Sequence, residues 1–264
     1  MRTWVVVAVF CLSSSSASAF RTLTDEPDLA GADGQPIGWT SWPIEIAVFD
    51  QPGDVVNGRD THAALEAGIA VWDRAACATG SLAAIGRTEL PAKLGDGRNT
   101  VQWVYENWSR YGDSDAVAVT ETQYQIKVGR YSLMEADILL NGTLAWDPSM
   151  LQHLDGVFAH ELGHVLGIVH PCEPNGENGA PRCGPEPMSL MHPLYDPRAF
   201  VLSDDDDEAT CFLYPGGQPR QEVEIDKACA VASPGTQIPR PALPIALIAG
   251  ALLTMSLRRR SRRG

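Results

Sequence analysis

Three histidines and a glutamate in this chain have the spacing of a metal site, because residues 160–170 read H-E-L-G-H-V-L-G-I-V-H. On a helix His160 and His164 lie one turn apart on the same face, so both imidazoles can reach one ion. Glu161 lies about 100° further round the helix, where it can take a proton from a metal-bound water. Three neutral nitrogen ligands favour zinc over calcium or magnesium and leave a fourth position for water, as a catalytic zinc requires.

His170 can join the same ion only if the helix ends before it. It follows His164 by six residues, about 600° of rotation, which is the far side of a continuing helix. Gly167 is the residue that permits a sharp turn between them. The pattern favours a zinc-dependent hydrolase with Glu161 as the general base. The alternatives are a helix with surface histidines or a zinc site kept for structure.

The segments around this motif predict an α+β domain, because their order is a strand, a helix, several strands, a second helix, a long loop and a third helix. The expected strands are Pro43–Phe49, Leu82–Ile85, Thr100–Tyr105, Ala116–Thr122 and Met134–Leu140. The expected helices run from Asp60 or Thr61 to about Ala76, from Ser149 or Leu151 through His164, and from Ser203 to Tyr214. Residues 20–41 are expected to form a loop, and so are residues 171–201, which are rich in Pro and Gly.

The composition supports one folded domain and argues against nucleic-acid binding. Of 264 residues 44% are hydrophobic and 20% are charged, which excludes wholesale disorder. Six of the 20 Lys and Arg residues lie at the termini, so residues 20–241 carry 14 basic residues against all 33 acidic ones. A body this acidic repels phosphate backbones.

Both ends of the chain have the pattern of targeting segments. Residues 1–19 combine a basic start, an apolar run and a small-x-small site, and predict a signal peptide cleaved after Ala19. A Pro/Gly-rich linker at 218–241 leads to the uncharged residues 242–257, about 24 Å of helix, followed by the basic tail 258–264. With the arginines in the cytoplasm, this end is either a single-span membrane anchor or a sorting tail similar to those of bacterial surface proteins. We therefore expect an exported protein at the cell surface.

The zinc motif resembles the signature of the metzincin metalloproteases, and the second half of the chain is most similar to their matrixin branch. Ser189–Tyr195 resembles the Met-turn, which makes Met191 the methionine beneath the metal. Pro193 and Tyr195 match positions in the wall of the S1′ pocket. His192 stands where matrixins usually have Tyr.

The resemblance covers residues 42–215 and implies a fold, an activity and a set of partners. The fold is a twisted five-stranded mixed sheet with two long helices and a third, C-terminal helix, in a domain spanning 42–217. The activity is that of an endopeptidase with one catalytic zinc, acting as a monomer on protein or peptide substrates that pair with an edge strand, here Ala116–Thr122. Asp205 and Asp206 would hydrogen-bond beneath the Met-turn. Calcium is possible, but no motif supports it.

Export makes disulfides the default for the five cysteines outside the signal peptide. These are Cys77, Cys172, Cys183, Cys211 and Cys229. The segment 181–185 resembles the matrixin cysteine switch but follows the zinc helix instead of preceding the domain, so a Cys172–Cys183 disulfide is favoured over a switch. If the fold is as the resemblance implies, Cys77 pairs with Cys211 and Cys229 is left unpaired.

A rival from another class is a surface-anchored zinc module that binds without turnover. The intact base Glu161 argues for the enzyme.

Overall fold

A computed structural model of the chain describes the central domain. It covers residues 20–26, 36–53, 55–56, 58–127, 130–146, 154–177, 179–184, 189–194 and 201–221. The expected signal peptide, the C-terminal helix, the basic tail and Cys229 lie outside the described residues. Among the helices within these ranges, none has the length and apolar character needed to cross a bilayer.

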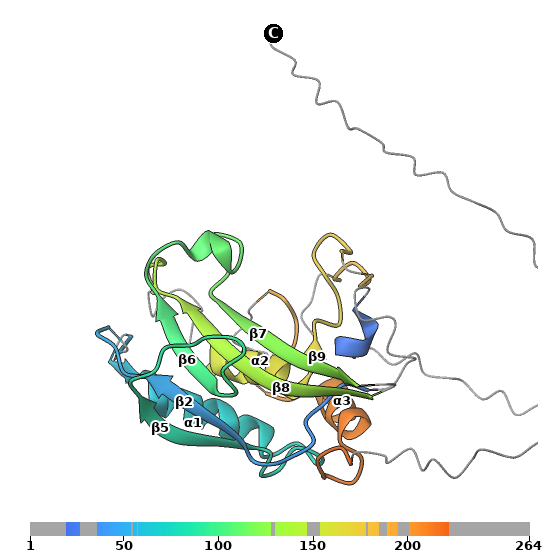
Figure 1. Cartoon of the computed structure of the whole chain (residues 1–264). Helices are drawn as coiled ribbons and strands as arrows, with labels where there is room; N and C mark the ends of the chain where they lie inside the picture. Colours follow the sequence, from blue (N-terminus) through green and yellow to red (C-terminus); the bar gives the residue numbers. More distant parts are fainter. Residues whose placement is uncertain are drawn as a thin grey trace, which may run out of the picture. The chain divides into compact units, whose positions relative to one another are not determined.

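A five-stranded mixed sheet forms one layer of the domain (Figure 1). Its strands are β2 (Ile44–Phe49), β5 (Leu82–Thr88), β6 (Asn99–Val104), β7 (Ala118–Lys127) and β8 (Arg130–Asn141). Their order is β5-β2-β6-β8-β7; β7 pairs antiparallel with β8, and the other pairs are parallel. The expected α+β architecture is confirmed, and β7 is an edge strand. β7 and β8 extend beyond the expected bounds because backbone pairing continues through polar residues that lack an apolar alternation.

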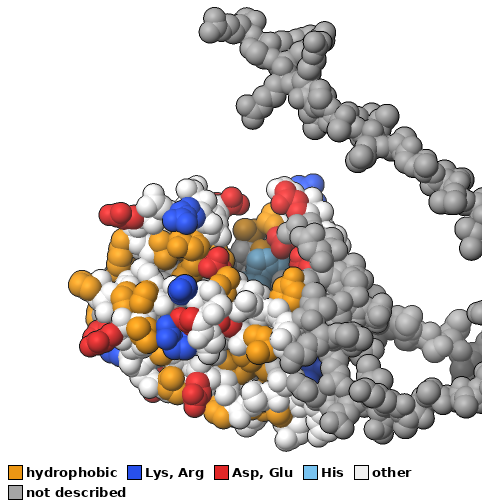
Figure 2. Space-filling view, in the orientation of Figure 1, with side chains coloured by type: hydrophobic (Ala, Val, Ile, Leu, Met, Phe, Trp, Pro, Cys, Tyr) orange, Lys and Arg blue, Asp and Glu red, His pale blue; other side chains and the backbone are white. Residues whose placement is uncertain are grey.

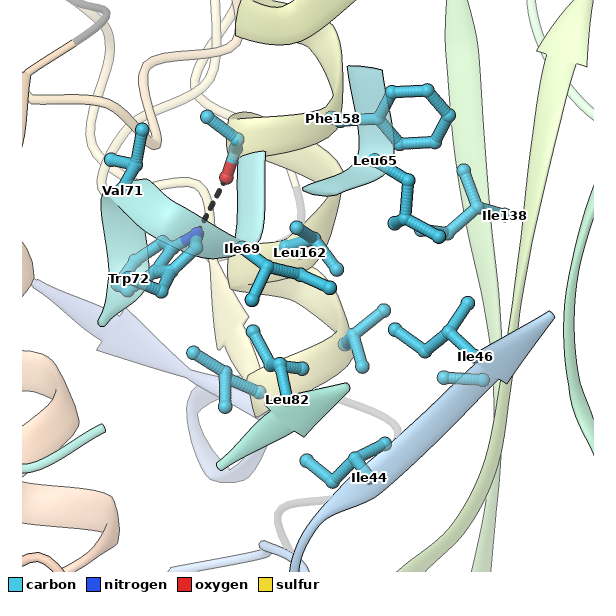
Figure 3. Close-up of a cluster of buried hydrophobic side chains, with 14 of the residues drawn as sticks. Ile44, Ile46, Leu65, Ile69, Val71, Trp72, Leu82, Ile138, Phe158 and Leu162 are labelled. Atoms are coloured by element: carbon cyan, nitrogen blue, oxygen red, sulfur yellow. Dashed lines mark hydrogen bonds between the residues drawn. The ribbon is translucent and has the colours of Figure 1, made fainter. Parts of the chain in front are cut away.

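Two helices, α1 (Thr61–Trp72) and α2 (Leu154–Leu166), pack on one another and on one face of the sheet. Between them lies the core, where Ile44 and Ile46 of β2 meet apolar side chains of both helices (Figure 3). Trp72 Nε1 donates a hydrogen bond of 2.7 Å to the Ala159 carbonyl, which fixes α1 against α2. This contact helps to fix the position of α2, which carries His160 and His164, over the sheet.

The first helix ends about one turn earlier than the sequence predicts. Asp60 caps its start by accepting from Ala63 N at 2.9 Å. At its other end the Ala76 amide donates to Asp207 Oδ1 at 3.0 Å, and this side chain takes the place of a helical carbonyl. The helix itself stops at Trp72, because the Arg74 and Ala75 amides donate to carbonyls three residues back instead of four, and Cys77 lies in the turns that follow.

The N-terminal segment is more ordered than the expected loop. β1 (Arg21–Thr22) pairs antiparallel with β9 (Ile168–Val169), directly after α2. The sequence around Arg21 does not indicate this strand, because it has only two residues and its partner lies far away in the chain. The remaining short elements are η1 (Leu23–Asp25), β3 (Val55–Val56), β4 (Arg59–Asp60) and η3 (Trp108–Arg110).

The third helix, α3 (Asp204–Leu213), begins as expected at Ser203, whose side chain forms a capping box with Asp206. Just after it, the buried Tyr214 hydroxyl donates to the Leu166 carbonyl at 2.6 Å and accepts from Trp39 N at 3.3 Å. The end of α3 is thereby tied to the last carbonyl of α2, next to the metal motif.

The two disulfides expected from the sequence are both present. Cys77–Cys211 links the turns after α1 to α3 across 134 residues, and Cys172–Cys183 closes an 11-residue loop after the metal motif. Two such bonds indicate folding in an oxidising compartment.

The two disulfides should differ in their contribution to stability. Loop-closure entropy predicts that Cys77→Ala/Cys211→Ala lowers the free energy of unfolding by about 4–5 kcal/mol, against about 3 kcal/mol for Cys172→Ala/Cys183→Ala. Urea denaturation of the zinc-free protein without reductant measures both. An equal or larger loss for the short loop would contradict the entropic explanation.

Candidate metal centre

The ring nitrogens of the three motif histidines converge on one point. His170 Nε2 lies 3.2 Å from His160 Nε2 and 3.3 Å from His164 Nε2. Zinc bonds imidazole nitrogen at about 2.0–2.1 Å with tetrahedral angles, which places neighbouring ligand nitrogens roughly 3.3 Å apart. The three side chains therefore fit a single zinc ion and form the one all-histidine group of this kind among the described residues.

Helix geometry and a sharp turn bring the third ligand to the other two. His160 and His164 lie on one face of α2, and the helix ends at Gly167, whose φ of 98° is left-handed. A side chain at this residue would strain the turn and approach the Ile37 carbonyl to 3.0 Å. β9 then pairs with β1 and carries the chain back to His170. The expected turn at Gly167 is confirmed.

Each ring is oriented by a hydrogen bond on its other nitrogen. His160 Nδ1 lies 2.8 Å from the Leu190 carbonyl, and His164 Nδ1 lies 2.8 Å from the Ile168 carbonyl. His170 Nδ1 lies 2.9 Å from Glu173 Oε1. All three partners are acceptors, so Nδ1 carries the proton and the Nε2 lone pair of each ring faces the common point.

Two of the three histidines, His164 and His170, are held in their neutral, ligating form. Burial, with the neighbouring His160, lowers the pKa of His164 to about 3. Burial and the other two rings lower the pKa of His170 to about 2. Neutral imidazole is the form that binds a metal ion, so the site is electrostatically prepared for a cation.

Glu161 lies beside this centre and contacts the edge strand. Its carboxylate is buried, and burial raises its pKa. The Thr120 hydroxyl of β7 donates to Glu161 Oε2 at 2.6 Å. This hydrogen bond opposes the effect of burial and fixes the orientation of the carboxylate.

A cavity of about 320 Å³ opens over the metal centre. Figure 2 shows histidine side chains within a hollow of the surface. Its walls come from the three histidines, Glu161, the start of β7, Leu23 of η1, Val157, β9 and Pro193. Glu161 and the ligands thus share one accessible, mainly apolar cavity that runs along an edge strand.

The segment 189–194 passes beneath the centre. Met191 is buried, and a Cβ at Gly163 of α2 would overlap its sulfur. Asp206 of α3 accepts from Leu190 N at 3.0 Å, while the Leu190 carbonyl holds His160. The expected hydrogen bond from Asp206 to this turn is therefore present. Asp205 differs, because its carboxylate meets the backbone of Phe20 instead.

The other predicted site residues divide by position. Pro193 lines the cavity, whereas Tyr195 and His153 lie outside the described residues. His62 pairs with Glu66 on α1, and His192 is buried beside the Cys172–Cys183 sulfurs, so neither belongs to the triad.

Sequence reasoning missed Thr120, Glu173 and Leu23. Thr120 lies 41 positions from Glu161, and Leu23 lies 144 positions from Gly167, in segments whose pattern shows only a strand and a loop. Glu173 had a weak signal, since an acidic residue three positions after a ligating histidine can reach its ring.

Zinc content tests the ligand set. We expect one zinc per chain in the purified protein and a large loss in His170→Ala, because two helix histidines alone leave the ion weakly held. His62→Ala is the matched control and should keep the metal. Elemental analysis after gel filtration measures all three; full zinc content in His170→Ala would contradict the assignment.

Comparisons with known proteins do not assign the chain to a family. No protein-family model matches the chain, and no curated protein is significantly similar to it. The five-stranded mixed sheet, the packed helices and the His-x₃-His…His cluster are consistent with a metzincin-like fold.

Proposed function

We propose that this protein is an exported zinc-dependent endopeptidase of the matrixin type. The observation that carries the proposal is the geometry of the cavity floor. Three histidine nitrogens lie at the separations of a tetrahedral zinc site, and the buried carboxylate of Glu161 stands in the same cavity. This combination fits hydrolysis by an activated water.

The residues divide the chemistry between them. A bound zinc would polarise the scissile carbonyl and lower the pKa of water. Glu161 takes the proton from the attacking water and delivers it to the leaving amine as the carbon–nitrogen bond breaks. Thr120 keeps the Glu161 carboxylate turned into the cavity through its 2.6 Å hydrogen bond.

The edge strand supports a peptide as the substrate. Within the part of the chain that the structure describes, β7 pairs only with β8, and the residues at its start line the cavity. An extended peptide can add to this free edge through main-chain hydrogen bonds, which demand little of its sequence. The apolar walls at Val157 and Pro193 would then select one side chain on the primed side of the scissile bond.

A non-catalytic zinc module is the second candidate. A structural zinc site is normally closed by four protein ligands. In the described part of the chain the histidine group has three members and opens into a cavity, which favours catalysis.

We also propose that residues 1–19 direct secretion and that residues 242–257 attach the protein to the cell surface. We propose that the protein acts there as a monomer.

Removal of the general base separates binding from catalysis. Glu161→Gln should retain full zinc content and lose peptidase activity by about 10²–10⁴-fold, because the amide cannot accept the proton. Cleavage of a fluorogenic peptide library, with Glu66→Gln on the exposed face of α1 as the control, measures this. Activity close to wild type in Glu161→Gln would mean that another group is the base.

Thr120 offers a finer test of the same site. Thr120→Val keeps the shape and removes the donor, and we expect kcat to fall by about tenfold or more while KM and zinc content stay near wild type. Thr120→Ser restores a hydroxyl and should recover most of the activity. A change in KM with kcat unchanged would argue that Thr120 only shapes the cavity. An equal loss of activity in Thr120→Val and Thr120→Ser would argue the same.

A further inference from the structure

The third ligand is held differently from the other two. His160 and His164 are both carried by α2, but His170 lies beyond its end, after the turn at Gly167. We infer that Glu173 is a positioning residue for His170, and that the Cys172–Cys183 disulfide strengthens metal binding by holding Glu173 in place. This inference rests on the proposed metal centre.

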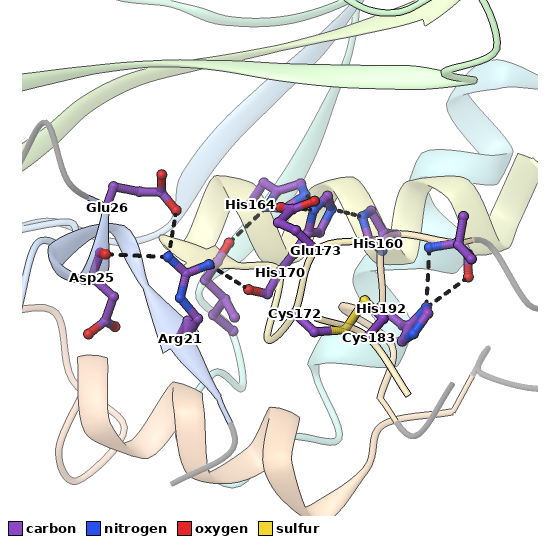
Figure 4. A network of polar contacts seen from close by, with 12 residues as sticks. Arg21, Asp25, Glu26, His160, His164, His170, Cys172, Glu173, Cys183 and His192 are labelled. Carbon is purple, nitrogen blue, oxygen red and sulfur yellow. Dashed lines mark hydrogen bonds and ion pairs between the residues drawn. A yellow bond between two sulfur atoms is a disulfide. The ribbon is translucent and has the colours of Figure 1, made fainter. Parts of the chain in front are cut away.

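The contact of Glu173 with the ring is the only charged one among the three rings' Nδ1 partners described above. Its Oε1 lies 2.9 Å from His170 Nδ1 (Figure 4). Backbone carbonyls hold the other two histidines. A carboxylate makes a stronger hydrogen bond than a carbonyl and raises the basicity of the ring. Glu173 also places a negative charge near the cation without ligating it.

The disulfide loop fixes Glu173 from both sides. The Glu173 amide donates to the Pro181 carbonyl at 2.9 Å, and the Cys183 amide donates to the Glu173 carbonyl at 3.0 Å. The Cys172–Cys183 bond joins the residue before Glu173 to the opposite arm of the loop. The backbone of Glu173 is therefore held close to His170, and the Glu173 side chain is only 21% exposed.

The backbone of His170 has its own support. Arg21 of β1 donates from Nη1 to the His170 carbonyl at 3.1 Å, and its Nη2 contacts Glu26 at 3.2 Å. These contacts set the position of the main chain and leave the rotation of the ring free. Glu173 supplies the orientation that the main chain does not.

Zinc affinity, measured by competition with a chromophoric chelator on the full chain with intact disulfides, tests the role of Glu173. Glu173→Ala should weaken zinc binding by about 10- to 100-fold, the usual effect of losing such a partner. Glu173→Gln keeps an acceptor but loses the charge and should fall between. Glu177→Ala, an exposed acidic residue of the same loop, is the control and should bind as wild type does.

A double-mutant cycle tests the role of the disulfide. Cys172→Ala/Cys183→Ala should weaken zinc binding in the wild-type background by about tenfold but have little further effect when Glu173 is already Ala, because the loop acts through that residue. Additive losses would contradict the inference, as would a Glu173→Ala protein that binds zinc as tightly as wild type.

Two further results separate the possible failures. If Glu173→Ala does not fold, as judged by far-UV circular dichroism of the zinc-free protein, Glu173→Gln carries the test, and wild-type affinity in that variant would overturn the role of the charge. A wild-type chain without zinc affinity would refute the proposed function and this inference together. Tight zinc binding without peptidase activity would refute only the enzymatic part.

Discussion

The metal centre depends on the end of one helix at Gly167. A continuing helix would carry His170 to the far side of the axis, away from His160 and His164. The left-handed backbone of Gly167 breaks the helix, and the pairing of β9 with β1 returns the chain to the centre. The three Nε2 atoms can meet only because this turn is made. The Tyr214 hydroxyl on the Leu166 carbonyl holds the same end of the helix from below.

Support for the ligands comes from parts of the chain that are distant in sequence. The turn at Leu190 orients His160 and is itself held by Asp206 at the start of α3. β7 reaches Glu161 through Thr120, and the disulfide loop reaches His170 through Glu173. Each of these three side chains, His160, Glu161 and His170, is therefore held by a different element. The geometry of the site therefore depends on the stability of the fold, because loosening any one of these elements would displace one side chain of the site.

The sequence predicts the parts of this arrangement that are local. The spacing of His160, His164 and His170, the glycine between the last two, and the cap at Ser203 are each contained within a few residues, so helix geometry is enough to interpret them. The end of α1 was predicted wrongly because the backbone tightens into short turns after Trp72, and the Ala76 amide then donates to Asp207 of the distant helix α3. The strand at Arg21 and the contact of Thr120 with Glu161 could not be predicted, since their partners are distant in sequence and short strands leave no periodic signal.

The central claim is that one zinc is bound by three histidines with a position left for water. X-ray absorption at the zinc edge on the purified protein tests it most directly. We expect three imidazole nitrogens and one non-protein oxygen at about 2.0–2.1 Å from the zinc, with no sulfur. A shell containing sulfur at about 2.3 Å would contradict the three-histidine ligand set, and four protein ligands would leave no position for water, as in a structural site.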